Sequence, residues 1–140
     1  MIKGKIFWGA VMMKNAMSFL TYFIFGSTLY GLIEIAYRNR THWSMLIVGG
    51  IAFYAIYAIS YNFSGKSLFV KCVISALFIT MLELFTGIIV NIIFKMNVWD
   101  YHNIPFNILG QICPAFTFLW FLISIPANAL IDCIKAYTDT

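Results

Sequence analysis

Charged side chains are scarce in this chain of 140 residues: only 10% are Asp, Glu, Lys or Arg, against about 25% in an ordinary soluble domain. So few charges cannot cover the outside of a compact body of this length, which excludes an ordinary soluble globule. The apolar content of 62% also excludes a disordered chain, since disorder requires low hydrophobicity. The sequence therefore predicts a single small membrane domain, residues 1–140, whose surface faces the lipid bilayer.

Cysteine and histidine are also too few to build common frameworks. The three cysteines, Cys72, Cys113 and Cys133, cannot pair completely and have no C-x-x-C spacing, so we expect buried thiols. His42 and His102 lack further ligands at metal-binding spacing, and no nucleophile stands beside a base. Basic residues are too scattered for a nucleic-acid stripe. These absences predict a protein that is not an enzyme and that has no cofactor, metal site or nucleic-acid partner.

Long apolar runs are abundant. A helix needs about 20 mostly apolar residues to cross the hydrocarbon core, and four runs meet that requirement: 16–37, 44–61, 72–94 and 108–131. None alternates apolar and polar residues at every second position, which argues against strands. The predicted fold class is all-α, an integral membrane bundle of four helices. We expect the two prolines of the fourth run, Pro114 and Pro126, to kink it.

Residues 2–14 precede the first run and mix apolar side chains with three lysines. This composition is typical of a short interfacial helix, or of the beginning of the first span. Lysine and arginine then set the orientation, because cytoplasmic loops are enriched in both. The side of the two termini carries six lysines: Lys3, Lys5, Lys14, Lys66, Lys71 and Lys135. The opposite side carries three basic residues: Arg38, Arg40 and Lys95. This difference predicts that both termini are cytoplasmic.

Two glutamates, Glu34 and Glu83, are the acidic residues that interrupt the predicted spans. An ionisable group inside a membrane is costly, so it tends to face the bundle interior and to mark a pathway or a pairing. Each glutamate lies on a polar stripe at helical spacing, and Glu34 has Arg38 four residues later. We expect a polar substrate- or ion-binding pocket in the outer half of the bundle, formed by Glu34, Arg38, Glu83, Asn91, Asp100, Asn107 and Gln111.

The pattern around these glutamates is compatible with three interpretations. Glu34 and Arg38 could form a satisfied ion pair while Glu83 is a protonated acid bonded to a neighbouring helix. The same residues could instead form a proton- or cation-handling site, or a surface for a partner. The polar segment before the fourth run adds Trp99, Tyr101 and Pro105 as structural or interface anchors. Asp100 is expected there as a helix cap, or paired with Lys95 or Arg38.

Several segments carry a family resemblance. Met81–Gly87 places Glu83 in a span that ends near a glycine, Trp99–Asn107 reads W-D-Y-H-N-I-P-F-N, and Gly110–Cys113 reads G-Q-I-C. Upstream, Gly31–Glu34 is followed by Tyr37 and Arg38. Together these segments resemble a bacterial family of ABC-transporter permeases called type IV, or CmpB-like. His102 stands where that family usually has Ser, and Pro114 where Leu is common.

The resemblance covers roughly Phe19–Ser124 and implies a transporter permease subunit in the bacterial cytoplasmic membrane. Ser64–Ser67 ends like a phosphate-binding loop, but Ser60 stands where that motif has its first glycine. An ATP-driven system would therefore need a separate ATPase chain. Four helices enclose little volume, so a homo-oligomer or a partner membrane subunit is expected to complete a path. Two alternatives stay open: a small proton-coupled multidrug exporter, and a pore-forming or structural membrane protein such as a holin.

Overall fold

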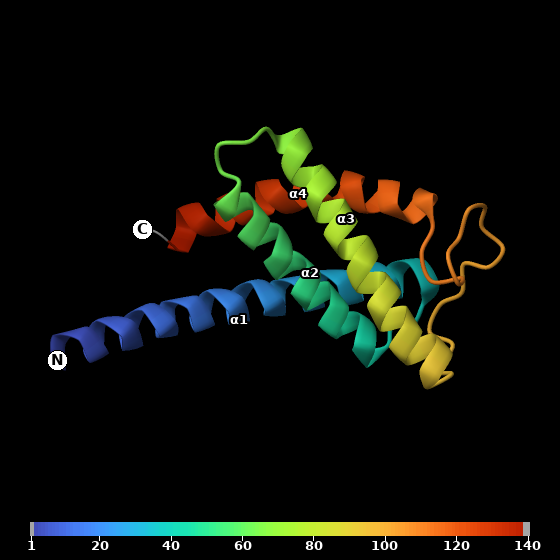
Figure 1. Cartoon of the computed structure of the whole chain (residues 1–140), viewed down its shortest axis with the longest axis horizontal. Helices are drawn as coiled ribbons and strands as arrows, with labels where there is room; N and C mark the ends of the chain where they lie inside the picture. Colours follow the sequence, from blue (N-terminus) through green and yellow to red (C-terminus); the bar gives the residue numbers. More distant parts are fainter. Residues whose placement is uncertain (1, 139–140) are drawn as a thin grey trace.

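The computed structural model describes residues 2–138, with side chains at residue 4 and at residues 9–138. Four helices form the molecule: α1 (Ile2–Arg38), α2 (Trp43–Asn62), α3 (Leu68–Gly87) and α4 (Pro114–Thr138) (Figure 1). A π-helical segment, η1 (Ile88–Ile93), continues α3. All four helices are long and apolar enough to cross a membrane, and the described residues contain no strand. The predicted all-helical, four-span fold is therefore confirmed.

The first helix agrees with the second of the two predictions for residues 2–14. Residues 2–14 are not a separate interfacial helix but the first part of α1, which runs for 37 residues without a break. At about 1.5 Å per residue such a helix is longer than the hydrocarbon core, and α1 extends beyond the other helices in Figure 1. The side chains of residues 2, 3 and 5–8, which include two of the lysines used for orientation, lie outside the described part.

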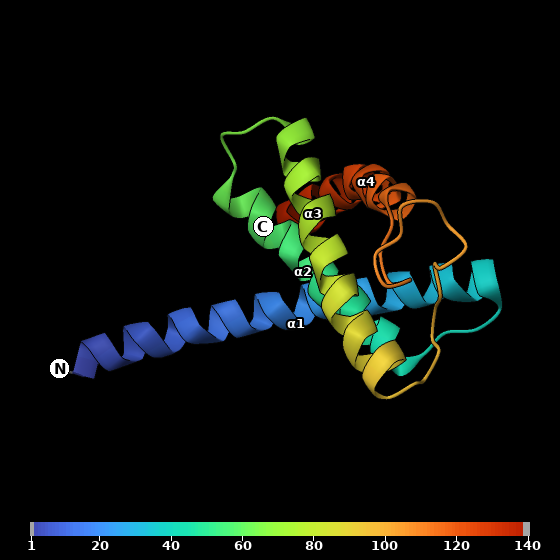
Figure 2. The ribbon, with the colours of Figure 1, turned by 45° about the vertical axis from the view of Figure 1, so that its right-hand side comes forward.

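The fourth span also begins later than its apolar run. Residues 108–113 belong to the long connection before α4, residues 94–113, and the helix begins at Pro114. Proline is favoured at the first helical position, where its missing N–H has no helical partner to lose. Pro114 therefore starts the helix rather than kinking it, and only Pro126 lies inside α4. The long connection lies beside the C-terminal end of α1 (Figure 2).

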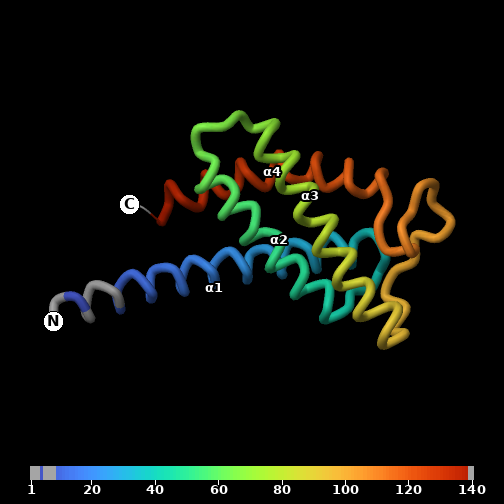
Figure 3. Tube along the Cα trace, viewed as in Figure 1, coloured from blue at the N-terminus to red at the C-terminus, as the bar shows by residue number. Residues whose placement is uncertain are grey.

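The chain alternates between two ends of the molecule. The N-terminus, the turn between α2 and α3, and the C-terminus lie toward one end, while the connection after α1 and the long connection before α4 lie toward the other (Figure 3). Side-chain caps mark two of the helix starts: Ser67 accepts a hydrogen bond from the N–H of Val70, and His42 accepts one from the N–H of Ser44. The alternation of the connections between the two ends of the molecule is what four successive membrane crossings require.

Small residues allow α1 and α2 to pack closely. A Cβ atom on Gly26 would lie 2.4 Å from Cβ of Phe53 and 2.5 Å from the carbonyl oxygen of Gly49. The Ser27 hydroxyl donates to the carbonyl oxygen of Leu46 at 2.7 Å across the same contact. Close backbone approach through small residues is the usual way in which membrane helices associate. The main core includes Tyr22, Phe53, Ile56, Ile79, Trp120 and Ile131.

We predict that Gly26→Ala lowers the free energy of unfolding in detergent by about 1–3 kcal/mol, because the added methyl group overpacks the contact between α1 and α2. Gly9→Ala is the matched control, since a Cβ atom at Gly9, in the same helix, would meet nothing within 4 Å. The control should leave stability unchanged or raise it slightly. Equal stability of the two variants in thermal or denaturant unfolding would contradict the close approach.

Candidate functional site

Glu83 lies in the last turns of α3 and is 1% exposed. Its two carboxylate oxygens accept separate hydrogen bonds: Oε1 from the Tyr101 hydroxyl at 3.2 Å, and Oε2 from Nε1 of Trp120 at 2.9 Å. Tyr101 belongs to the long connection and Trp120 to α4. The carboxylate therefore joins three parts of the chain that are distant in sequence.

No cation pairs with Glu83 in the described part of the chain. The ion pairs recorded among those residues are Arg38 with Glu34 and His102 with Asp100. An intramembrane acid normally pairs with a basic group or faces a water-filled cavity. Here two neutral donors, an indole and a phenol, bond the two oxygens, and no cation of the described chain lies beside the acid.

Glu83 also lines a cavity of about 200 Å³ to which all four helices contribute. Tyr30 comes from α1, Phe53 from α2, and Trp120 and Ala127 from α4. The rings of Tyr30 and Trp120 are 6.0 Å apart between centroids. The walls are otherwise aliphatic or glycine, so a single carboxylate faces an apolar, partly aromatic space.

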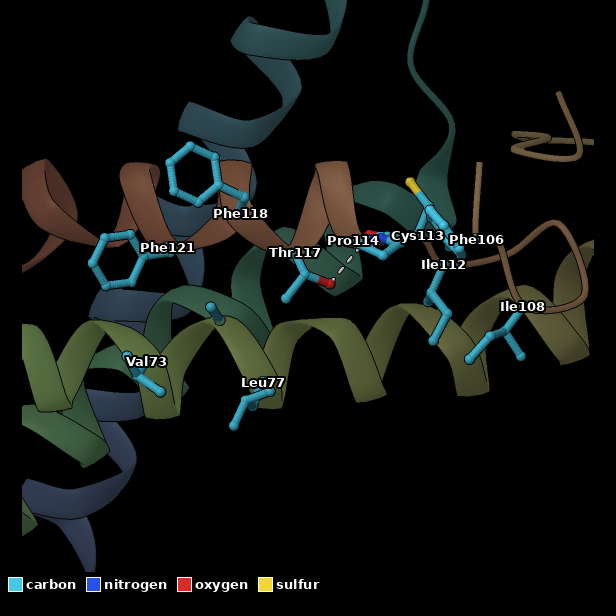
Figure 4. Close-up of a pocket in the computed structure, with 11 residues that line it drawn as sticks. Val73, Leu77, Phe106, Ile108, Ile112, Cys113, Pro114, Thr117, Phe118 and Phe121 are labelled. Carbon is cyan, nitrogen blue, oxygen red and sulfur yellow. Dashed lines mark hydrogen bonds between the residues drawn. The ribbon is translucent and has the colours of Figure 1, made fainter. Parts of the chain in front are cut away.

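A larger hollow of about 490 Å³ lies between α3 and α4, under the long connection (Figure 4). Its one hydroxyl, on Thr117, is already bonded to the carbonyl oxygen of Cys113 at 3.2 Å and to Thr80 at 2.9 Å. The remaining lining is almost entirely apolar, with Leu77 and Phe118 largely exposed. In a membrane protein such a surface suits lipid chains, so the smaller cavity is the stronger candidate site.

Glu34 and Arg38 form an ion pair at the end of α1, as their spacing predicts. Nε of Arg38 donates to Glu34 at 3.0 Å, and a terminal guanidinium nitrogen donates to the carbonyl oxygen of Val98 at 3.1 Å. The pair thus reaches the long connection, and the Glu34 carboxylate also interacts with Tyr30, which lines the cavity at Glu83. The positive charge of the Arg38 guanidinium is already compensated by the Glu34 carboxylate.

Asn91 and Gln111 hold the other side of the same connection. The Asn91 amide accepts from the N–H of Val98 at 2.7 Å and donates to Oε1 of Gln111 at 2.8 Å. Gln111 is 3% exposed and also donates to the carbonyl oxygen of Leu109 at 3.0 Å. Both backbone groups of Val98 are therefore bonded to side chains, one from α1 and one from η1. A buried irregular backbone in a membrane protein needs such partners.

Two aromatic residues of the connection, Trp99 and Tyr101, pack against the rest of the protein. Trp99 is 6% exposed and its Nε1 donates to the carbonyl oxygen of Gln111 at 3.1 Å. The ring of Tyr101 stacks on Phe116 at 4.4 Å between centroids. Burial raises the pKa of the Tyr101 hydroxyl, and the nearby Glu83 charge raises it further, so this group stays protonated and donates. The connection thereby reaches Glu83.

Three residues expected in the pocket or as anchors, Asp100, Asn107 and Pro105, lie in the exposed or half-buried part of the long connection. Asp100 is exposed and bonds to His102, so it neither caps a helix nor pairs with Lys95 or Arg38. The Asn107 amide donates to the carbonyl oxygen of Ile104 at 2.9 Å and accepts from Gly110 at 3.0 Å. Pro105 is exposed in the turn between Asp100 and Asn107.

Two residues near Glu83 were absent from the sequence prediction, Tyr30 and Trp120. Tyr30 lies one helical turn before Glu34 and interacts with its carboxylate, which i,i+4 spacing could have indicated. Trp120 lies in an uncharged run, and its only signal was an indole N–H that needs a partner when buried. Among the described residues no three His, Cys, Asp or Glu side chains gather closely enough to hold a metal ion.

We predict that Asn91→Ala loosens the long connection, because the Val98 N–H and the side-chain Oε1 of Gln111 both lose their partner. Each unsatisfied buried group costs about 1–3 kcal/mol. Hydrogen–deuterium exchange in detergent should show the Val98 amide exchanging at least about tenfold faster. Asn103→Ala is the control, since Asn103 is exposed in the same connection; similar exchange in both variants would contradict this role of Asn91.

The exposed pair in the connection gives a pH prediction. A hydrogen bond from the His102 N–H, and then the His102 side chain, hold the pKa of Asp100 below its usual value. The charged carboxylate therefore favours the folded loop above its unfolded pKa, and this contribution is lost as pH falls through the lowered pKa. His102→Ala should raise the pKa of Asp100 part of the way back, because the backbone bond remains. Carboxyl ¹³C NMR titration checks this, and an unchanged pKa would refute it.

Comparison with known protein families finds a match over most of the chain. No curated protein and no solved structure matches the chain. Residues 17–138 match the family described as "Putative ABC-transporter type IV". The matched segment includes α2, α3 and α4 entirely and more than half of α1. That match and the four membrane-spanning helices establish a multi-pass membrane protein of transporter type. The chain belongs to the type IV ABC-transporter family.

Proposed function

We propose that this chain is the membrane-spanning subunit of a transporter and that Glu83 is the group at which the transported species is held. The observation that carries the proposal is a carboxylate, 1% exposed, with no cationic partner among the described residues and with a cavity beside it. An uncompensated charge inside a bundle is costly to maintain, so its presence marks function more strongly than stability. Membership of the type IV family supports the transporter part of this proposal.

The other polar residues take a positioning role in this proposal. The Glu34–Arg38 pair and the Asn91–Gln111 pair secure the connection at Val98. That connection carries Tyr101, which donates to Glu83. Movement of the connection would therefore change the hydrogen bonding of the Glu83 carboxylate. Such coupling is what a transporter needs between its site and one side of the membrane.

The proposal includes a bacterial cytoplasmic membrane with both termini in the cytoplasm. Lys66 lies in the turn between α2 and α3, Lys71 in the first turn of α3, Lys135 near the end of α4, and Lys14 in the N-terminal half of α1. The turn and the two chain ends lie toward the same end of the molecule (Figure 3), and basic residues are typical of cytoplasmic loops. A bundle of four helices encloses little volume, so we expect a homo-oligomer or a partner membrane subunit. A separate ATPase chain would supply the energy, as the family description implies.

A second candidate, a proton-coupled exporter, is favoured by the same uncompensated carboxylate. A buried acid that exchanges a proton for a cation needs no ATPase. The two candidates differ in energy source: transport into inside-out vesicles should depend on ATP and the partner chain in the first case, and should collapse with an uncoupler in the second. Leakage of a trapped dye from resting vesicles would instead indicate a pore, and would contradict both.

We predict that Glu83→Gln abolishes transport while the protein still folds. Cells producing the wild-type chain should change their tolerance to at least one compound in a panel of toxic cations, anions and neutral molecules. Glu83→Gln should reduce that change by about tenfold or more, because the charge that holds the transported species is gone. Asp132→Asn, the same chemical change at an exposed residue of α4, is the control.

Equal membrane abundance and equal thermal unfolding in detergent must accompany this comparison. A tolerance change that Glu83→Gln leaves intact would contradict the role of Glu83. The absence of any tolerance change with the wild-type chain and its ATPase partner would contradict transport itself.

A further inference from the structure

The cavity beside Glu83 has the composition of a ligand site. We propose that it binds an organic cation with an apolar body, the positive charge lying next to Glu83 and the body among the aromatic and aliphatic walls. This inference names the class of substrate that the proposed transporter site would hold. Binding of the cation does not depend on the proposed function; only its transport rests on that function.

The first argument is charge. Glu34 and Arg38 neutralise each other, whereas Glu83 has no cation beside it among the described residues. The two bonds to Glu83 come from Trp120 and Tyr101, and both donors are neutral. When the carboxylate is ionised, the cavity has a negative end with no cation of the described chain beside it, and a ligand that carries one positive charge compensates that end.

The second argument is the chemistry of the walls. Tyr30, Phe53 and Trp120 are three aromatic residues lining a cavity of about 200 Å³. Aromatic faces attract cations by their quadrupole, and quaternary ammonium groups are recognised in this way. Apart from Glu83 the lining offers almost no oxygen ligand. An inorganic ion such as Na⁺ or Mg²⁺ would therefore lack the several oxygen atoms that hard cations require.

The third argument is access. Leu29 and Ile33 of α1 also line the cavity and are 36% and 51% exposed on the outer surface of the bundle. Both lie in the span that faces the hydrocarbon. A cation with an apolar body partitions into the membrane and reaches the cavity from the side, past these two residues. A strongly hydrated ion has no comparable route.

The test measures the equilibrium binding of benzyltrimethylammonium to the purified full-length chain in an uncharged detergent. Isothermal titration calorimetry gives the affinity and the number of sites. We expect saturable binding at one site per chain. Glu83→Gln should weaken the affinity by about tenfold or more, since each tenfold step corresponds to about 1.4 kcal/mol. Neopentylbenzene, which has the same shape with carbon in place of nitrogen, should compete at least about tenfold less effectively.

Two further variants keep the test decisive. Ala127→Leu fills part of the cavity and leaves Glu83 intact, so it should also weaken binding even if Glu83→Gln folds poorly. Asp132→Asn removes an exposed carboxylate from α4 and should bind as the wild type does. The proposal is overturned if the folded wild-type chain shows no saturable binding, if Ala127→Leu binds normally, or if the neutral isostere competes equally.

These outcomes separate the ligand from the transport function. Binding that depends on Glu83, without any transport in vesicles, would retain the cation site and reject the transporter. Transport that depends on Glu83, without binding of benzyltrimethylammonium, would retain the transporter and reject the organic cation.

Discussion

Everything distinctive in this fold depends on the burial of one carboxylate. Glu83 is 1% exposed inside an apolar bundle, and its oxygens need hydrogen-bond partners because a buried polar group without one is costly. Trp120 supplies one donor from α4, and Tyr101 supplies the other from the connection that precedes it. The connection must therefore fold inward instead of lying on the surface.

An inward connection creates a second requirement, because its own backbone groups also need partners. Arg38 and Asn91 meet it by bonding the carbonyl and the N–H of Val98, and Gln111 accepts from Asn91 in turn. The polar residues thus form two linked sets, one that holds the chain in place and one that surrounds the charge. In lipid, where helices gain little from hydrophobic association, such bonds and close contacts between small residues determine the packing.

The sequence predicted the four spans because apolar run length is a direct physical requirement of the bilayer. It also predicted the Glu34–Arg38 pair, which depends only on i,i+4 spacing. It failed where tertiary contacts decide: residues 108–113 are apolar but not helical, since a buried connection and a helix have similar composition. The bond from Trp120 to Glu83 joins positions 37 residues apart, and no local pattern reports it.

The most direct test of this account is a double-mutant cycle between Glu83 and Tyr101, measured by reversible unfolding in detergent. Tyr101→Phe removes only the hydroxyl and preserves the stack on Phe116, while Glu83→Leu removes the acceptor. If the hydroxyl donates to a buried carboxylate, the cycle should give a coupling energy of about 1.5–3 kcal/mol. Additive effects of the two substitutions, with no coupling, would show that the connection does not reach Glu83 and would contradict the account.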